Sequence, residues 1–249
     1  MGRKIGSIAK FSDEIAWIVQ RPIAHRALHD KRAGRYENTL SAARAAIEKG
    51  FSIELDLHPS ADGVPMVFHD LKLDRLTGEK GSIRQKTANQ LRKISIAGSS
   101  DHIPTLAELL ETVGGSVGLV MEMKGVAGED DGFVEAVGDA LRGYGGNAAL
   151  MSFNHWLVED ARRLASSWPV GLTAAGGDRF FAVHDAIARK ADVDFVAYAI
   201  SDLPCNFVRQ FRTSGKPVIS WTITTPGLAT KSARYADQIT FEGFDPVAA

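Results

Sequence analysis

Two carboxylates and an imidazole alternate with apolar residues in one short segment of the chain. Glu54, Asp56 and His58 stand two residues apart, and leucine fills the positions between them. In a β-strand, side chains two residues apart lie on the same face. The segment therefore predicts a strand with one apolar face and one face that carries two acids and a histidine. Because burying such groups has no packing benefit, the pattern indicates a functional site.

A turn brings further polar residues back toward this strand. Residues 61–63 read Ala-Asp-Gly, a turn signal, and the apolar run of residues 64–68 that follows ends in His69-Asp70. A histidine returned beside two carboxylates strengthens the prediction of a site.

Strand-like and helix-like segments alternate along the rest of the chain. Expected strands are residues 22–27, 53–58, 118–123, 150–153, 170–174, 195–200, 218–223 and 238–241. Expected helices are residues 39–49, 106–113, 133–144, 156–166, 181–189, 206–213 and 227–235. Alternation of apolar strands with helices predicts an α/β fold with a parallel sheet covered by helices. Periodicity alone also allows a doubly wound sheet.

Composition is that of an ordinary globular protein. The chain has 249 residues, of which 45% are hydrophobic and 24% are charged, and this length fits one large domain. A net charge of −1 gives no reason to expect a nucleic-acid partner. Cys205 is the only cysteine, so no disulfide forms within the chain.

The N-terminal region has basic residues but no long apolar segment. Polar residues 12–14 follow Arg3, Lys4 and Lys10, which predicts a short helix at residues 12–19 rather than a signal peptide. No segment approaches the roughly 18 apolar residues of a membrane span. We therefore expect a cytoplasmic protein without stable membrane insertion.

Short motifs in a fixed order resemble the glycerophosphodiester phosphodiesterase family. They are His25-Arg26, Glu37-Asn38-Thr39, the E-L-D of residues 54–56, the D-G-V-P-M-V-F-H-D of residues 62–70, Glu122-Met123-Lys124, Ser152-Phe153 and Trp221-Thr222. The resemblance covers about residues 22–241. It implies a (β/α)8 TIM barrel of one domain, with a core at about residues 22–245, a short N-terminal helical extension and a small excursion after the second strand.

Three acids are expected to converge at the mouth of this barrel. Glu54, Asp56 and Glu122 each sit late in a strand, and the carboxyl ends of barrel strands form the active site. Three adjacent carboxylates cannot all stay ionised without a cation, although they could instead form salt bridges at the rim. In the resembling family their counterparts hold a metal, with the counterpart of Glu37 beside it. We expect one divalent ion, Mg²⁺ or Ca²⁺, because hard ions prefer oxygen ligands.

The resemblance assigns His25 and His69 to catalysis. Cleavage of a phosphodiester needs a base to activate the attacking hydroxyl and an acid to protonate the leaving alcohol, and histidine serves both roles near neutral pH. We assign His25 as the base and His69 as the acid. Histidines elsewhere are expected to be structural, namely His29, His102, His155 and His184.

Other residues are expected to bind the substrate or support the site. Arg26 and Lys124 could grip phosphate oxygens. Trp221 could form a wall of the substrate pocket or belong to the core. His58 could contact the substrate or support other site residues, and Asn38 could bond within its loop or cap the following helix.

The chain departs from the family pattern at three places. Ala27 replaces the glycine that usually follows His-Arg, residues 58–61 lack the lysine often seen before Asp-Gly, and residues 240–242 read Thr-Phe-Glu where the family usually has an aspartate after the threonine. None of these changes removes a predicted metal ligand or catalytic histidine. Several aromatic residues near strand ends could form an apolar rim around the mouth: Phe153, Trp156, Phe180, Phe181, Phe241 and Phe244.

The leading hypothesis is metal-dependent hydrolysis of glycerophosphodiesters to glycerol 3-phosphate and an alcohol, a reaction of lipid and glycerol metabolism. The partner would be a small-molecule phosphodiester. The apolar rim keeps open a lysophospholipid or sugar phosphodiester as substrate. A catalytically silent barrel that binds a metal or phosphate is a further alternative. The sequence does not indicate the oligomeric state.

Overall fold

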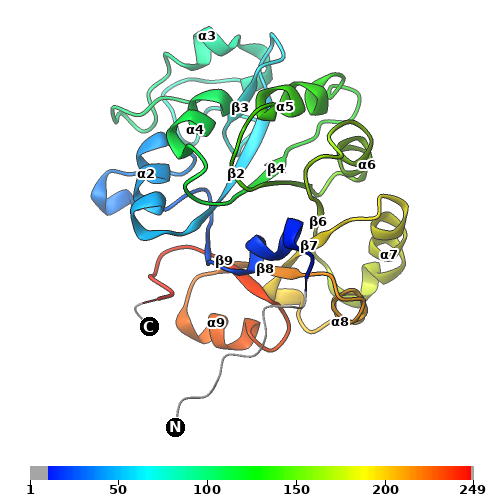
Figure 1. Ribbon diagram of the computed structural model, residues 1–249. Helices are drawn as coiled ribbons and strands as arrows, with labels where there is room; N and C mark the ends of the chain where they lie inside the picture. Colours follow the sequence, from blue (N-terminus) through cyan, green and yellow to red (C-terminus); the bar gives the residue numbers. More distant parts are fainter. Residues whose placement is uncertain (1–10, 248–249) are drawn as a thin grey trace.

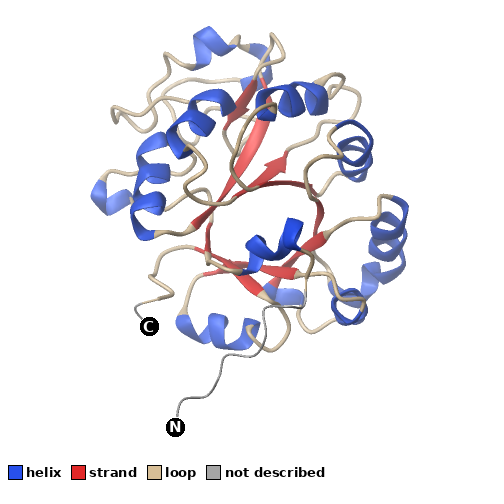
Figure 2. Ribbon diagram, viewed as in Figure 1, coloured by secondary structure: helices blue, strands red, loops and turns tan. Residues whose placement is uncertain are grey.

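Eight parallel strands close into a barrel in the computed structural model, which describes residues 11–247. β1 pairs with both β2 and β9, and these pairings join the ends of the sheet order β1-β9-β8-β7-β6-β5-β4-β2. Figure 2 shows the strands as a ring with the helices outside it. The strands are β1 (Ile23–Ala24), β2 (Ser52–Pro59), β3 (Pro65–Val67), β4 (Leu119–Met123), β5 (Ala148–Ser152), β6 (Val170–Ala174), β7 (Phe195–Ala199), β8 (Val218–Ile223) and β9 (Gln238–Phe241). The barrel prediction is confirmed.

Helices connect successive barrel strands on the outside of the ring. They are α2 (Leu40–Lys49), α4 (Leu106–Val113), α5 (Phe133–Leu141), α6 (His155–Leu164), α7 (Phe181–Lys190), α8 (Asn206–Thr213) and α9 (Pro226–Ser232). Within the described residues no helix follows β9. Short 3₁₀ helices lie in the loops: η2 (Lys31–Ala33), η4 (Gly177–Phe180) and η5 (Ile200–Asp202).

Local sequence signals set the ends of these helices. The Thr39 hydroxyl accepts a hydrogen bond from the Ala42 amide at the start of α2, and Gly50 ends the helix with φ of 67°, a conformation that favours glycine. At the start of α4, Thr105 and Glu108 form a capping box. Both helices were predicted within a residue or so because these signals are local.

Alternation along β2 separates the core from the site. Ile53, Leu55 and Leu57 belong to the cluster that packs the barrel against its helices, so Glu54 and Asp56 point into the barrel. The interior below them is filled by apolar side chains such as Phe195. A Cβ on Gly171 would lie 2.3 Å from the Phe195 ring, which shows how closely this ring packs against β6.

The N-terminal extension closes one end of the barrel. It consists of α1 (Asp13–Ala16) and η1 (Trp17–Val19) and lies across the ring in the foreground of Figure 1. Trp17 and Ile18 are buried with side chains from the barrel interior. A Cβ on Gly118 would lie 2.4 Å from the Trp17 ring. The predicted short helix is thus present, whereas Arg3, Lys4 and Lys10 lie outside the described residues.

The excursion after β2 forms a small unit with its own core. It contains β3, which pairs antiparallel with β2, followed by η3 (Ile83–Gln85) and α3 (Ala88–Leu91). Its apolar residues form a cluster separate from the two barrel clusters: Met66, Phe68, Leu73, Leu76, Ile83, Ala88, Leu91, Ile94, Ile96 and Ile103. This unit places His69 at the barrel mouth.

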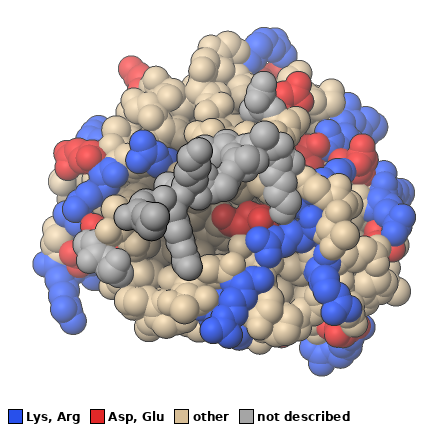
Figure 3. All heavy atoms as spheres, turned by 60° about the horizontal axis from the view of Figure 1, so that its bottom comes forward, with Lys and Arg blue, Asp and Glu red and all other residues tan. Residues whose placement is uncertain are grey.

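The surface carries charges of both signs. On the face drawn in Figure 3, lysine and arginine side chains have aspartate and glutamate among them. None of the helices in residues 11–247 has the length and apolar character needed to cross a lipid bilayer.

Candidate active site

The three predicted acids meet at the carboxyl ends of β2 and β4. Asp56 and Glu122 are directly paired in the ladder between these strands, and Glu54 precedes Asp56 on the same face. Each residue offers a carboxylate oxygen, and these oxygens all lie within 4.8 Å of one another. The three residues are at most 6% exposed.

The charges of these acids are strongly coupled. Burial and the charges of Asp56 and Glu122 raise the pKa of Glu54 well above its usual range. Burial also raises the pKa of Glu122, although Lys124 opposes this shift. Burial alone would raise the pKa of Asp56, but the charges around it, chiefly that of Lys124, hold this pKa below its usual range. A cation would relieve this repulsion, and an all-oxygen donor set fits a hard divalent ion.

Lys124 and Arg26 lie against the acids. Lys124 Nζ is 2.9 Å from Asp56 Oδ1 and donates a hydrogen bond to Glu122. The Arg26 amide donates to Glu54 Oε2 at 2.9 Å, and Arg26 Nε lies 3.5 Å from Asp56 Oδ2. Both cations therefore stand where a phosphate beside the acids would meet them.

The turn after β1 places the Arg26 backbone amide at the site. Arg26 has φ of 52° and Ala27 has φ of 65°, which is the left-handed region that favours glycine. Ala27 thus keeps the conformation that explains the glycine usual in the family at this position. The cost of this conformation for a residue with a Cβ is about 1–2 kcal/mol.

Glu37 lies beside the three-acid cluster rather than within it. Its Oε1 accepts hydrogen bonds from Arg26 Nη1 at 2.8 Å and Arg75 Nη2 at 2.7 Å, and its Oε2 accepts from Arg75 Nη1 at 3.0 Å. Burial opposes ionisation, but these bonds lower the pKa of Glu37. Both of its oxygens are therefore engaged by guanidinium groups.

Asn38 fixes Asp56 and does not cap the helix. Its Nδ2 donates to Asp56 Oδ2 at 2.9 Å, and its Oδ1 accepts from the Asp56 amide at 3.2 Å. Thr39 supplies the cap of α2 instead. Both predicted roles for Asn38, bonding within its own loop and capping the helix, thus differ from the observed one, in which its side chain bonds Asp56 on β2.

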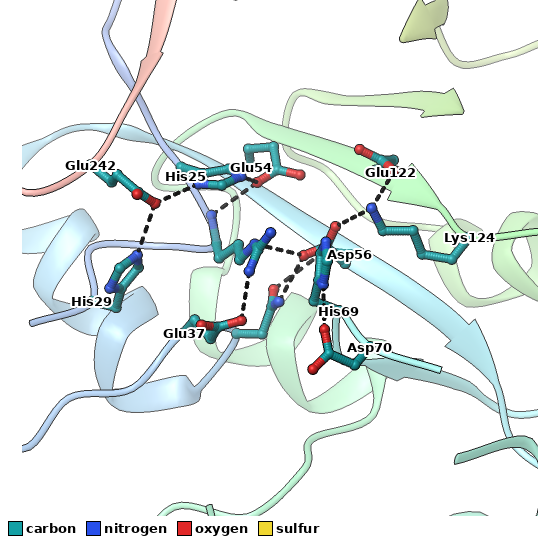
Figure 4. Close-up of polar contacts among 12 residues, drawn as sticks. His25, His29, Glu37, Glu54, Asp56, His69, Asp70, Glu122, Lys124 and Glu242 are labelled. Carbon is teal, nitrogen blue, oxygen red and sulfur yellow. Dashed lines mark hydrogen bonds and ion pairs between the residues drawn. The ribbon is translucent and has the colours of Figure 1, made fainter. Parts of the chain in front are cut away.

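Each of the two predicted catalytic histidines donates a hydrogen bond from Nδ1 to a carboxylate (Figure 4). His25 Nδ1 lies 2.7 Å from Glu242 Oε2, and His69 Nδ1 lies 2.6 Å from Asp70 Oδ1. An ionised carboxylate only accepts hydrogen bonds, so Nδ1 carries hydrogen in both rings. Proton exchange in the cavity would therefore take place at Nε2. Both rings line one cavity with the three acids, and His25 Nε2 is 3.9 Å from Glu54 Oε2.

His58 supports His69 from behind. Its Nε2 donates to the backbone carbonyl of His69 at 3.1 Å, and the residue is 3% exposed. Burial lowers the pKa of His58 to about 4, so the ring is neutral near pH 7. His58 does not line the cavity, and a supporting role is the one that the structure favours.

The cavity has a volume of about 100 Å³ and a second, less charged wall. Trp221 and Phe153 form part of it, with ring centroids 5.4 Å apart in an edge-to-face arrangement. Thr173 also lines the cavity and is 2% exposed. Thr173 Oγ1 and Trp221 Nε1 are buried without a hydrogen-bond partner among the described residues.

The predicted aromatic rim is wrong in part. Phe241 is 1% exposed, and its ring packs edge-on against Phe51 at 5.0 Å, with Phe244 on it at 5.8 Å. In β9, Ile239 and Phe241 point toward the helices, so Phe241 belongs to the core between the barrel and its helices. Phe153 and Phe180 remain exposed, at 45% and 39%.

Three residues of the site were given no role from the sequence. Glu242 holds His25, Asp70 holds His69, and Arg75 joins Asp70 to Glu37, with its Nε 2.6 Å from Asp70 Oδ2. Asp70 ends the motif of residues 62–70, and Arg75 lies five residues after it, so the motif itself is a signal of the importance of Asp70. Glu242 stands two residues after Thr240 of β9, so alternation along the strand points both side chains toward the mouth.

Comparisons with known proteins show the family and agree with the fold. The model of the Glycerophosphoryl diester phosphodiesterase family matches residues 25–244. A glycerophosphodiester phosphodiesterase of Caldanaerobacter subterraneus subsp. tengcongensis is 32% identical over 147 residues, 55% of this chain and 60% of that protein. A putative glycerophosphodiester phosphodiesterase of Bacillus subtilis, YhdW, is 27% identical over 78% of this chain and 84% of its own length.

Solved structures share the barrel. A phosphodiesterase of Oleispira antarctica, solved in complex with the product sn-glycerol-3-phosphate, has a TM-score of 0.81 at 24% identity and covers 90% of this chain and 93% of its own. The glycerophosphodiester phosphodiesterase of Thermotoga maritima has a TM-score of 0.73 at 24% identity, over 89% of this chain and 94% of its own. With the family model matching most of its length, the chain belongs to the glycerophosphoryl diester phosphodiesterase family.

Proposed function

We propose that the chain hydrolyses glycerophosphodiesters to glycerol 3-phosphate and an alcohol, with one divalent metal ion. The observation that carries the proposal is the arrangement of the cavity. It brings a cluster of three carboxylates together with two histidines, each held at Nδ1 by a carboxylate, and with two cations. Family membership supports the reaction class.

The metal would be held by Glu54, Asp56 and Glu122. When bound, it would polarise the phosphoryl oxygens and offset the charge that develops on them. Asn38 keeps the Asp56 carboxylate in place. Glu37 contributes by holding Arg26 and Arg75 beside the cluster.

The histidines divide the proton transfers. His25 presents an unprotonated Nε2 and removes the proton of the attacking hydroxyl, which is water or the 2-hydroxyl of the glycerol. Attack by the 2-hydroxyl would expel the alcohol and form a cyclic phosphate, which water would open to glycerol 3-phosphate in a second step. His69, when protonated, gives its Nε2 proton to the leaving alkoxide. Arg26 and Lys124 bind the non-bridging phosphate oxygens.

The less charged wall would bind the glycerol moiety. Thr173 Oγ1 and Trp221 Nε1 lack partners in the described residues, and a buried polar group without a partner costs about 1–3 kcal/mol. Hydroxyl groups of the glycerol would satisfy both atoms. This places the alcohol that leaves on the opposite, open side of the phosphate.

A bulkier diester, such as a lysophospholipid, is the second candidate. The exposed rings of Phe153 and Phe180 favour it, because apolar groups at the mouth could receive an acyl chain. An open apolar surface of this kind discriminates poorly, so replacing a small alcohol with a bulkier one should change kcat/KM by no more than about tenfold.

A panel of substrates and metals tests the proposal. The protein is stripped with chelator and dialysed, then assayed with Mg²⁺ and with Ca²⁺ on glycerophosphocholine, a lysophospholipid and a sugar phosphodiester. Release of glycerol 3-phosphate that depends on the ion and is lost in His25→Ala is expected. Glu111→Gln changes an exposed acid on α4 and serves as the control. Binding of metal without turnover of any diester would instead indicate a catalytically silent barrel.

A further inference from the structure

Glu242 contacts two histidines at the edge of the site. It follows β9, and its Oε2 accepts a hydrogen bond from His25 Nδ1 at 2.7 Å. The same oxygen lies 3.5 Å from Nε2 of His29. Figure 4 shows Glu242 between the two rings, with His25 on the side of Glu54 and His29 on the other side. The three residues form a chain that leads from the loop after β1 to the cavity.

The position of this carboxylate is a property of the local sequence. The residue after Thr240 is Phe241, whose side chain is buried against Phe51 on the outer side of the barrel. Thr240 lines the cavity, and alternation along the strand gives Glu242 the same orientation. A carboxylate one residue later than the family pattern is therefore aimed at His25.

The contact decides which nitrogen of His25 carries hydrogen. A neutral imidazole has one N–H and one acceptor nitrogen, and its hydrogen-bond partners select between them. Because Glu242 accepts at Nδ1, the acceptor is Nε2, which is the nitrogen that can remove a proton in the cavity. A ring without this partner could place its hydrogen on Nε2 and could also rotate.

The two histidine–carboxylate pairs are anchored differently. Asp70, which holds His69, is gripped by two hydrogen bonds from Arg75, at 2.6 and 3.1 Å. Glu242 has His29 as its second partner, and its side chain is 34% exposed. His29 Nε2 is buried and makes no hydrogen bond among the described residues, so its contact with Glu242 Oε2, at 3.5 Å, is looser than that of His25.

We propose that Glu242 is the positioning residue for His25, and that His29 in turn holds Glu242. The chain His29–Glu242–His25 sets the tautomer and direction of the base. This inference rests on the proposed role of His25 as the base.

Kinetics of single variants and one double variant form the first part of the test. Glu242→Ala is expected to lower kcat on glycerophosphocholine by about 10- to 150-fold, the worth of a charge-assisted hydrogen bond, and to change KM little. Glu242→Gln keeps an acceptor, so its kcat should fall less than that of Glu242→Ala. The kcat of His29→Ala should fall less than that of Glu242→Gln. Glu111→Ala is the matched control. In a His25→Ala background, Glu242→Ala should have no further effect.

Imidazole ¹⁵N spectra of the folded protein form the second part and do not depend on turnover. Neutral His25 in the wild type should show hydrogen on Nδ1, and Glu242→Ala should shift the population toward hydrogen on Nε2. An unchanged tautomer in Glu242→Ala and Glu242→Gln would overturn the proposal. An equal loss of kcat with and without His25 would do the same, because it would show a structural effect.

Failure of the proposed function is distinguishable from failure of this inference. Full turnover by His25→Ala would refute the assignment of the base. The spectra would still decide whether Glu242 sets the tautomer of the His25 ring, since they report on His25 in the resting protein. If Glu242→Ala does not fold, Glu242→Leu, which also lacks an acceptor, carries both measurements.

Discussion

Replacing Asp70 with asparagine tests whether His69 is held in place as a proton donor. The bond from His69 Nδ1 to Asp70 is 2.6 Å long. Burial opposes the charge of Asp70, but hydrogen bonds from Arg75 and His69 lower its pKa, so it is ionised near pH 7. A hydrogen bond to a charged group contributes about 1.5–3 kcal/mol. At about 1.36 kcal/mol for each factor of ten, Asp70→Asn should lower kcat on glycerophosphocholine by about 10- to 150-fold.

The leaving group identifies the step that is affected. Choline leaves as a poor alkoxide and needs the acid, whereas nitrophenolate leaves well without one. His69→Ala should therefore lose about 10²–10⁴-fold on glycerophosphocholine, the usual contribution of a positioned acid, and recover most of this loss on a glycerophospho-nitrophenyl ester. The activity of Asp70→Asn should likewise recover on the glycerophospho-nitrophenyl ester. The comparison uses kcat values for both substrates at saturating metal, with Glu111→Gln as the control.

The pattern across variants can refute the reasoning. His25→Ala should be impaired on both substrates alike, because the attacking hydroxyl still needs a base. Recovery of His25→Ala alone would exchange the roles of the two histidines. Recovery of neither variant would show that the acid is another group, and an unimpaired Asp70→Asn would show that the 2.6 Å contact does not matter for turnover.

Three further predictions concern the ion, acid pH and the glycerol wall. Exhaustive removal of the metal should abolish turnover, and Asp56→Asn should weaken Mg²⁺ or Ca²⁺ binding in calorimetry far more than Glu111→Gln does; full activity in excess chelator would contradict this. The hydrogen bond from His25, together with the nearby His29 ring, holds the pKa of Glu242 below its usual 4.5, so its contribution to stability is complete above about pH 4.5 and is lost as the pH falls below that value. The free energy of unfolding should thus decline more steeply below pH 4.5 in the wild type than in Glu242→Gln, and equal slopes in denaturant titrations would disprove the linkage. Thr173→Val should lower kcat/KM on glycerophosphocholine by about 2- to 12-fold, the worth of a neutral hydrogen bond, without lowering the melting temperature; unchanged kinetics would exclude Thr173 from substrate binding.

The parts of the site that lie on single strands could be predicted from the sequence. Alternation in β2 places Glu54 and Asp56 on one face whatever the rest of the fold does, and Glu122 follows from the parallel pairing of β2 with β4. Helix caps such as Thr39 and Gly50 act within four residues, so the bounds of α2 and α4 were also accessible. The same alternation explains why Phe241 points outward to the helices. It was nevertheless predicted at the rim of the mouth because it is an aromatic residue near a strand end.

Contacts between distant segments could not be predicted. Glu242 reaches His25 across 217 positions of sequence, and it does so only because β9 pairs with β1 to close the barrel. Arg75 reaches Glu37 from the excursion, whose loop geometry has no periodic signal. The engagement of Glu37 by two arginines depends on both of these long-range placements.

The separate core of the excursion has a consequence for how activity is lost on warming. Residues buried in a cluster of their own can open as a unit at a lower free energy than the whole protein. Opening of residues 66–103 would withdraw His69 and Arg75 together, whereas Glu54, Asp56 and Glu122 would stay on strands of the intact barrel. Such a partly open molecule would keep its acidic cluster and lose its proton donor, and on cooling it would regain turnover without having to refold the barrel.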